Sequence, residues 1–232
     1  MLKRQELFEV PFAQQNQFIQ LHLLPTVGEF LSAYHAANIH VVAPKTFEKQ
    51  TAHSRYLIAS PNKIQSLSVP IHHSSRGLPF YEAKIDYNQK WVKDHKQALQ
   101  SAYGKSAFFE YYDYRFFQVL DQQPETLESL SIQWLKILHQ NLGWPSQLHF
   151  TTPNHPNPIQ ENTAKASTET NLKPIPISPI TNLIIPPYTQ VFEHKFGFRA
   201  DVSAIDLLFN LGPLAKEYIY NSIFVSQFPS PK

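Results

Sequence analysis

Cysteine is absent from this chain of 232 residues, which excludes disulfide bonds, thiolate metal sites and a cysteine nucleophile. Glycine is scarce, and none of the 6 glycines lies close enough to another to form a phosphate-binding loop of the G-x-G-x-x-G or Walker type. A G-x-S-x-G elbow is also missing, so nothing singles out one serine as a nucleophile. The sequence therefore identifies no cofactor, and catalytic groups must be sought among its other polar residues.

The chain also lacks an excess of one charge. Its formal net charge is +2, with lysines and acidic residues interspersed, which does not favour binding to nucleic acid or to an anionic membrane. No run approaches the roughly 20 apolar residues of a membrane span, and the N-terminus lacks the apolar region of a signal peptide. We therefore expect a cytoplasmic protein with no nucleic-acid partner and no membrane span. Its oligomeric state stays open.

Proline is abundant but unevenly distributed, because 9 of the 19 prolines lie between Pro145 and Pro187. Large apolar residues are almost absent from 154–173, so this stretch cannot bury enough surface to offset the entropy lost on ordering. We predict a disordered loop, rich in Pro, Asn and Thr, over residues 152–180. The remaining chain then divides into a tail or edge strand, a core and a C-terminal part of the same domain, at residues 1–20, 21–150 and 184–222.

Short apolar runs bounded by proline and other turn residues predict the strands. They lie at residues 22–24, 39–43, 56–60, 65–71 and 80–85, with another at 148–151. Thr26 can cap a helix between the first two, so the chain opens with a strand–helix–strand unit that is compatible with parallel pairing. We expect an α/β or α+β single domain, in which a mixed sheet over 21–86 packs against helices over 89–143 and a C-terminal helical unit closes the fold.

A helix beginning near Gln89 has one apolar face and leads into an aromatic run. His95 lies on the apolar face, one turn after Trp91. It is either a buried histidine with one ring nitrogen donating to a carbonyl, or a histidine that lines a pocket and acts near neutral pH. Phe or Tyr occupies 8 of the 15 positions from Tyr103 to Phe117. Because buried tyrosine hydroxyls need partners, this run favours a partly wet cleft.

The loop over residues 45–54 is polar and joins a strand end to the predicted hairpin. It carries Lys49 and His53, and Arg55 follows directly after it. Loops at the ends of parallel strands often bind ligands, and an arginine can hold a phosphate or carboxylate with two parallel hydrogen bonds. A solvated surface loop is the alternative interpretation.

The histidines do not form a recognisable metal motif. H-E-x-x-H is absent, and the adjacent His72 and His73 would point to opposite faces of a strand. We therefore expect no dedicated metal site, and a metal-dependent hydrolase is the weakest alternative. The ligand set that deserves a test consists of His53, His95 and either Glu48 or Asp86.

Four stretches, in the same order, resemble the WbqC-like protein family. They are LLPTVGEF at 23–30, FEKQTAHSRYLIASPN at 47–62, KIDYNQKWVKDHKQALQSAYGKSAFFEYY at 84–112 and YTQVFEHKFGFRADVSAIDLLFNLGP at 188–213. Members often carry an aspartate pair after the second strand, where this chain has Ala43 and Pro44, so a role of those acids is not expected here. Some members lie in surface-polysaccharide gene sets, and the resemblance therefore implies work on activated sugars or their amino groups.

We expect an enzyme, of the transferase type, that acts on a nucleotide-linked or otherwise anionic small molecule. The residues expected to carry the site are Lys49 and Arg55 as anion holders, His53 or His95 as general base, and Tyr103 and Trp91 as pocket wall. The alternative is a non-catalytic binding or assembly protein that uses the aromatic run as its partner surface.

Overall fold

Three short parallel strands form one of the two sheets of the fold. The computed structural model describes residues 16–34, 36–151 and 185–227. The parallel sheet has the order β1-β2-β5, with β1 at Asn16–Gln20, β2 at Asn38–Val42 and β5 at Gln147–Thr151. Ile39 and Val41 of the central strand are fully buried. These two residues fix the side of the sheet that faces the core.

The helix α1 (Val27–Ala33) connects β1 to β2, because parallel strands cannot be joined by a tight turn. Thr26 caps it, as the sequence predicts: the Thr26 hydroxyl accepts the Glu29 backbone N–H at 3.2 Å, and Glu29 Oε2 accepts the Thr26 backbone N–H at 2.8 Å. The first strand, however, lies at 16–20 and not at 22–24. By Leu23 the chain has left the sheet, since its N–H donates to the Ala52 carbonyl at 3.0 Å.

A separate antiparallel hairpin consists of β3 (Arg55–Ala59) and β4 (Ile64–Ser68). The sequence predicts both strands, and their turn is closed by a hydrogen bond from the Ser60 N–H to the Lys63 carbonyl at 3.1 Å. The α/β class is confirmed, but the strands divide into two sheets instead of one mixed sheet over 21–86. The reason is that the third strand of the parallel sheet, β5, comes from beyond the central helices.

Residues 80–85 do not form the predicted strand. Phe80–Glu82 is a 3-10 turn, η3, stabilised by a hydrogen bond from the Ala83 N–H to the Phe80 carbonyl at 3.1 Å. Phe80 and Ala83 are both fully buried, a spacing of three that one face of a strand cannot give. Another 3-10 turn, η2, covers His73–Ser75. A 3-10 turn therefore directs the apolar side chains of this stretch into the core, and the alternating faces of a strand do not.

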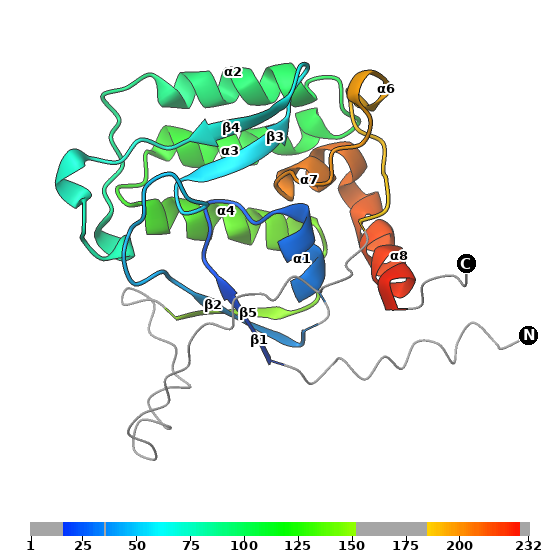
Figure 1. Ribbon diagram of the computed structural model, residues 1–232, viewed down its shortest axis with the longest axis horizontal. Helices are drawn as coiled ribbons and strands as arrows, with labels where there is room; N and C mark the ends of the chain where they lie inside the picture. The colour runs from blue at the N-terminus through cyan, green and yellow to red at the C-terminus, as the bar shows by residue number, and fades with distance from the viewer. Residues whose placement is uncertain (1–15, 35, 152–184, 228–232) are drawn as a thin grey trace, which may run out of the picture.

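Three long helices form the middle of the molecule. They are α2 (Trp91–Tyr103), α3 (Phe109–Gln122) and α4 (Leu127–Asn141), and α3 packs against the other two. The helix α3 takes up most of the aromatic run: it buries Phe109 and Phe116, two turns apart, and exposes 69% of Tyr111 and 52% of Tyr114. In Figure 1, α4 lies on the side of the three-stranded sheet and α2 at the opposite side of the molecule.

A C-terminal unit completes the core, which confirms the predicted helical unit. It contains α6 (Glu193–Phe196), α7 (Ile205–Leu211), the 3-10 turn η4 (Gly212–Leu214) and α8 (Ala215–Gln227). Phe209 of α7 is fully buried, and its ring centroid lies 5.2, 5.0 and 5.8 Å from those of Tyr103, Phe109 and Phe116. The centre of the aromatic core is therefore shared between α2, α3 and α7.

The loop predicted over 152–180 lies outside the described residues, and so do residues 1–15. Within the described ranges, no helix is long and apolar enough to cross a membrane.

Gly212 sets how closely the C-terminal unit approaches α3. Its φ is +50°, and a Cβ atom placed there would lie 2.5 Å from the Phe108 ring. We expect Gly212→Ala to lower the free energy of unfolding in urea by about 2–4 kcal/mol, because backbone strain and a steric clash add.

Gly197 provides a matched control, since its φ is +72° but no atom lies within 4 Å of the corresponding Cβ position. Gly197→Ala should therefore carry only the backbone cost, on the order of 1 kcal/mol. Equal losses in the two variants would contradict the steric part of the prediction.

Candidate functional site

A cavity lies where the chain leaves β1 and β2. Its volume is about 450 Å³, and the residues that line it include Gln20, His22, Lys45, Glu48, Thr51 and His53. Gln20 is the last residue of β1, and Lys45 follows shortly after the end of β2. Ligands of open α/β sheets bind at the carboxyl ends of parallel strands. The position, the size and the polar lining of this cavity therefore suit a small polar ligand.

His22 is held by a carboxylate from α1. Its Nδ1 lies 3.1 Å from Glu29 Oε1, while Glu29 Oε2 accepts the Thr26 backbone N–H at 2.8 Å and the Thr26 hydroxyl at 3.1 Å. Burial acts to raise the pKa of Glu29, but the hydrogen bond and charge of His22 and the bonds from Thr26 outweigh it, so this pKa lies below its ordinary value. Glu29 is therefore an ionised carboxylate that contacts the helix cap on one side and His22 on the other.

His53 is a second, buried histidine of the cavity. Its Nδ1 accepts the Glu48 backbone N–H at 3.3 Å, and its ring centroid lies 6.5 Å from that of His22. Burial lowers the pKa of His53, a positive charge on His22 lowers it further, and Glu48 offsets only part of this effect. The ring is therefore neutral at pH 7. Because its Nδ1 acts as an acceptor, its proton is on Nε2.

The Nε2 atoms of His22 and His53 are both available. Neither has a hydrogen-bond partner in the described part of the chain, and neither is a buried atom. With Nδ1 engaged in each ring, Nε2 is the atom that can meet a ligand.

One cation of the cavity and two that lie near it in the sequence have no carboxylate partner among the described residues. Lys45 lines it, Lys49 is exposed on the adjacent turn, and Arg55 begins β3 two residues after His53. The ion pairs found among the described residues do not include any of these three cations. Their charges are therefore free to attract an anionic ligand.

His95, by contrast, lies in the core under the hairpin. It is 3% exposed, its Nε2–H donates to the Ser68 carbonyl at 3.1 Å, and its Nδ1 accepts the Tyr56 hydroxyl at 3.2 Å. Burial lowers its pKa to about 4, although the bond to Ser68 and the charge of Asp94 act in the other direction. Both ring nitrogens are bonded within the protein. Of the two roles that the sequence leaves open for His95, the structure shows the buried histidine that donates to a carbonyl.

Trp91 and Tyr103 accompany His95 in the core and do not line the cavity. The indole N–H of Trp91 donates to the Asp86 carbonyl at 3.1 Å. Tyr103 is fully buried, and its hydroxyl accepts the Ala59 N–H at 3.3 Å. Of the residues that the sequence predicts for the site, His53 lines the cavity, Lys49 and Arg55 lie within four residues of His53 along the chain, and the three α2 residues lie elsewhere.

Sequence reasoning missed three lining residues: Gln20, His22 and Lys45. A signal was present, since all three lie at or just after the ends of two strands that run parallel. His22 was obscured because the apolar residues on both sides of it predict a strand.

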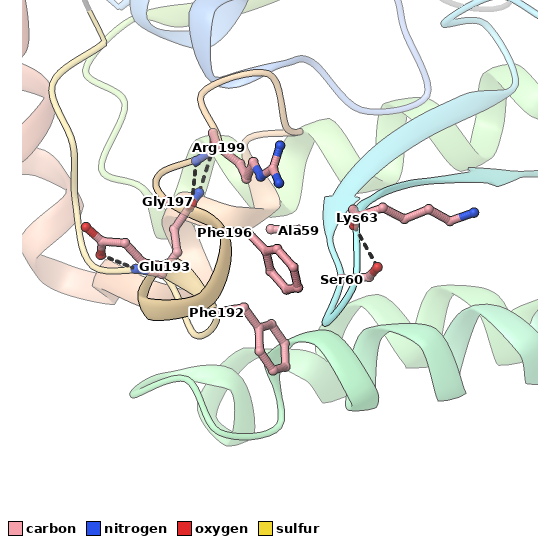
Figure 2. Close-up of a pocket in the computed structure, with 9 residues that line it drawn as sticks. Ala59, Ser60, Lys63, Phe192, Glu193, Phe196, Gly197 and Arg199 are labelled. Carbon is pink, nitrogen blue, oxygen red and sulfur yellow. Dashed lines mark hydrogen bonds between the residues drawn. The ribbon is translucent and has the colours of Figure 1, made fainter.

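A second hollow lies at the other end of the hairpin, between the Ser60–Lys63 turn and α6 (Figure 2). Figure 2 shows Phe192 and Phe196 beside this turn, with Arg199 above them. Its volume is only about 10 Å³, which is room for no more than about one water molecule. The larger cavity is therefore the better candidate for a substrate site.

Metal ligation finds no support in the described ranges, which contain no group of three or more His, Cys, Asp or Glu side chains that could hold an ion. In particular, both ring nitrogens of His95 are engaged by Tyr56 and Ser68, so that neither is free to coordinate an ion together with His53.

Comparison with protein families gives a match that spans more than half of the chain. Residues 20–170 match the model of the WbqC-like protein family. No curated protein and no solved structure matches the chain. The matched region contains every residue that lines the larger cavity, and Pro44, at the position where the resemblance leads one to expect an aspartate, is one of them.

The core role of His95 predicts a pH dependence. The unfolded chain takes up a proton near the ordinary pKa of 6.5, but folded His95 resists protonation until about pH 4. Stability should therefore fall as the pH drops through this window, by about 3 kcal/mol from this residue. His95→Gln has no imidazole at this position, so its stability should lack this pH-dependent loss. At pH 7 the variant should be less stable than the wild type, because it leaves a buried hydrogen-bond partner unpaired.

The measurement is urea unfolding of both proteins between pH 7 and pH 4. The difference in the free energy of unfolding between the wild type and His95→Gln should narrow toward pH 4. The contributions of the other histidines are the same in both proteins and therefore cancel. A gap that does not change with pH would contradict the prediction.

Proposed function

Because the chain belongs to the WbqC-like protein family, we propose a function that is built on the cavity within the matched region. The protein is proposed to be an enzyme of the transferase type that acts on a nucleotide-linked sugar or another anionic small molecule. The observation that carries this proposal is the cavity of about 450 Å³ at the ends of β1 and β2, where two histidines and a lysine meet.

The cations support an anionic substrate. Lys45 lines the cavity, Lys49 and Arg55 lie close in sequence to its lining residue His53, and none of the three has an ion-pair partner in the described part of the chain. A phosphate or diphosphate group is the natural ligand for such a set, because lysine provides a point charge and arginine a two-pronged donor. In this arrangement Lys45 would contact the anion, while Lys49 and Arg55 would attract it from the rim.

His53 supports group transfer from such an anion. In the proposed step, the bond between the transferred carbon and the phosphate oxygen breaks, and its electron pair leaves on the phosphate. A neutral ring with its proton on Nε2 can donate a hydrogen bond to that oxygen, and Lys45 can stabilise its charge. The new bond forms from an oxygen or nitrogen of the acceptor to the same carbon, and the acceptor loses its proton to a base.

One observation favours a different function. Tyr111 and Tyr114 of α3 expose 69% and 52% of their surfaces, and exposed aromatic side chains of this kind are common in protein interfaces. A non-catalytic assembly protein would use this surface. Loss of a stoichiometric partner in Tyr111→Ser/Tyr114→Ser, with unchanged thermal stability, would favour that function.

The proposed function predicts ligand-dependent stability. In a thermal-shift screen of UDP-sugars, nucleotides and acyl-coenzyme A, a true ligand at 100 times its Kd should add about 2.7 kcal/mol of stability, or roughly 5–10 °C. Lys45→Ala should weaken binding of that ligand roughly tenfold or more, because it removes a charge-assisted contact.

Lys93→Ala is the matched control, since Lys93 is an exposed lysine of α2 without an ion pair in the described residues. It should leave the Kd unchanged. No shift with any anionic compound, or a shift that survives Lys45→Ala, would contradict the proposal.

A further inference from the structure

We propose that His22 is the general base of the cavity and that Glu29 is the residue that positions it. This inference rests on the proposed function and supplies the base that group transfer requires. It also restricts the acceptor to compounds whose reacting group is a neutral hydroxyl or amine.

The geometry fixes which nitrogen of His22 can accept a proton. Its Nδ1 lies 3.1 Å from Glu29 Oε1, and an ionised carboxylate can only accept a hydrogen bond. Nδ1 therefore carries the hydrogen of the neutral ring, and the free lone pair is on Nε2. That atom has no partner in the described part of the chain and is not buried, and the residue lines the cavity.

Glu29 is itself fixed by the cap of α1. Its Oε2 accepts the Thr26 backbone N–H at 2.8 Å and the Thr26 hydroxyl at 3.1 Å, while its own backbone N–H donates to Thr26 Oγ1 at 3.2 Å. A carboxylate that accepts two hydrogen bonds at one oxygen, inside a capping box that also fixes its backbone, cannot rotate freely. The second oxygen is thus presented to His22 in a fixed direction, as the orienting group of a catalytic histidine requires.

The charged groups around His22 give the two rings different roles. Glu29 Oε1 lies against Nδ1 of His22, whereas Lys45 and the buried ring of His53 line the same cavity from the loop after β2, together with Glu48. A charge on His22 disfavours one on His53. His22 therefore presents a lone pair on Nε2 and His53 a hydrogen on Nε2, with ring centroids 6.5 Å apart, so that one bound substrate can contact both.

The base sets the class of acceptor. The O–H or N–H bond of the acceptor breaks, its proton moves to His22 Nε2, and the electron pair left behind forms the bond to the transferred carbon. The phosphate leaves with the electron pair of the broken C–O bond, and His22 later returns its proton to water. A carboxylate acceptor is already deprotonated and would have no use for this residue, so we assign a sugar hydroxyl or an amine as the acceptor group.

Glu29→Gln tests the inference without knowledge of the substrate. Glutamine preserves the capping box, but its amide oxygen must accept the Thr26 N–H, which turns its NH₂ group toward His22 Nδ1. The neutral ring should then move its hydrogen from Nδ1 to Nε2, a change seen directly in ¹⁵N NMR of the imidazole. The urea concentration at the midpoint of unfolding should be the same in Glu29→Gln as in the wild type, whereas Glu29→Ala should unfold at a lower urea concentration because it loses the carboxylate part of the cap.

Chemical modification provides the second readout. Diethyl pyrocarbonate attacks a free imidazole lone pair, so His22 should react at least fivefold more slowly in Glu29→Gln. The exposed His73 should react equally in both proteins and serves as the internal control. Bound UDP-sugar should protect His22 in the wild type.

The outcomes separate the two proposals. If the wild type carries its hydrogen on Nε2, or if Glu29→Gln changes neither the tautomer nor the modification rate, the pairing of His22 with Glu29 is overturned even where a UDP-sugar stabilises the protein. If the tautomer switches as expected but no anionic compound stabilises the protein, the proposed function is overturned, and the role of His22 as base with it.

Discussion

Parallel pairing of β1 with β2 is the constraint on which the candidate site depends. Two parallel strands cannot be connected by a tight turn, so α1 must carry the chain back along the sheet. The carboxyl ends of both strands then lie at the same edge, which brings residues from 22 onward next to residues from 45 onward. The hydrogen bond from the Leu23 N–H to the Ala52 carbonyl ties these two segments together. The cavity is the space that this arrangement leaves open.

The helix α1 also explains why the carboxylate of Glu29 has two roles. Glu29 lies in the first turn of α1. An acidic side chain at this place accepts a hydrogen bond from a free backbone N–H and interacts favourably with the helix dipole. His22 lies just before that turn, because the chain has to pass the end of β1 to enter the helix. Stability of α1 and orientation of the histidine thus come from a single side chain. Any substitution at this position affects both unless it keeps the hydrogen-bonding shape of the carboxylate.

Local features of this fold could be predicted from the sequence, while features that depend on distant contacts could not. The cap at Thr26 and the hairpin around Pro61 rest on a few neighbouring residues, and the structure confirms both. The apolar stripe of α2 places His95 inward, but the stripe does not reveal what the inward face meets. The partners on that face are Tyr56 and Ser68 of the hairpin, which lie 39 and 27 residues from His95 in the sequence. The range predicted for the helices, 89–143, contains α3, but the aromatic run does not show where α3 begins and ends.

The place of Phe209 has a consequence for how the chain acquires its structure during synthesis. The ring lies at the centre of an aromatic cluster whose other members, Tyr103, Phe109 and Phe116, are made about a hundred residues earlier. While the ribosome is still adding the intervening segment, these rings lack their central partner. The helices α2 and α3 must therefore wait, partly unpacked, until α7 has emerged. Synthesis at roughly 5–20 residues per second leaves the apolar surface of these rings without Phe209 for several seconds.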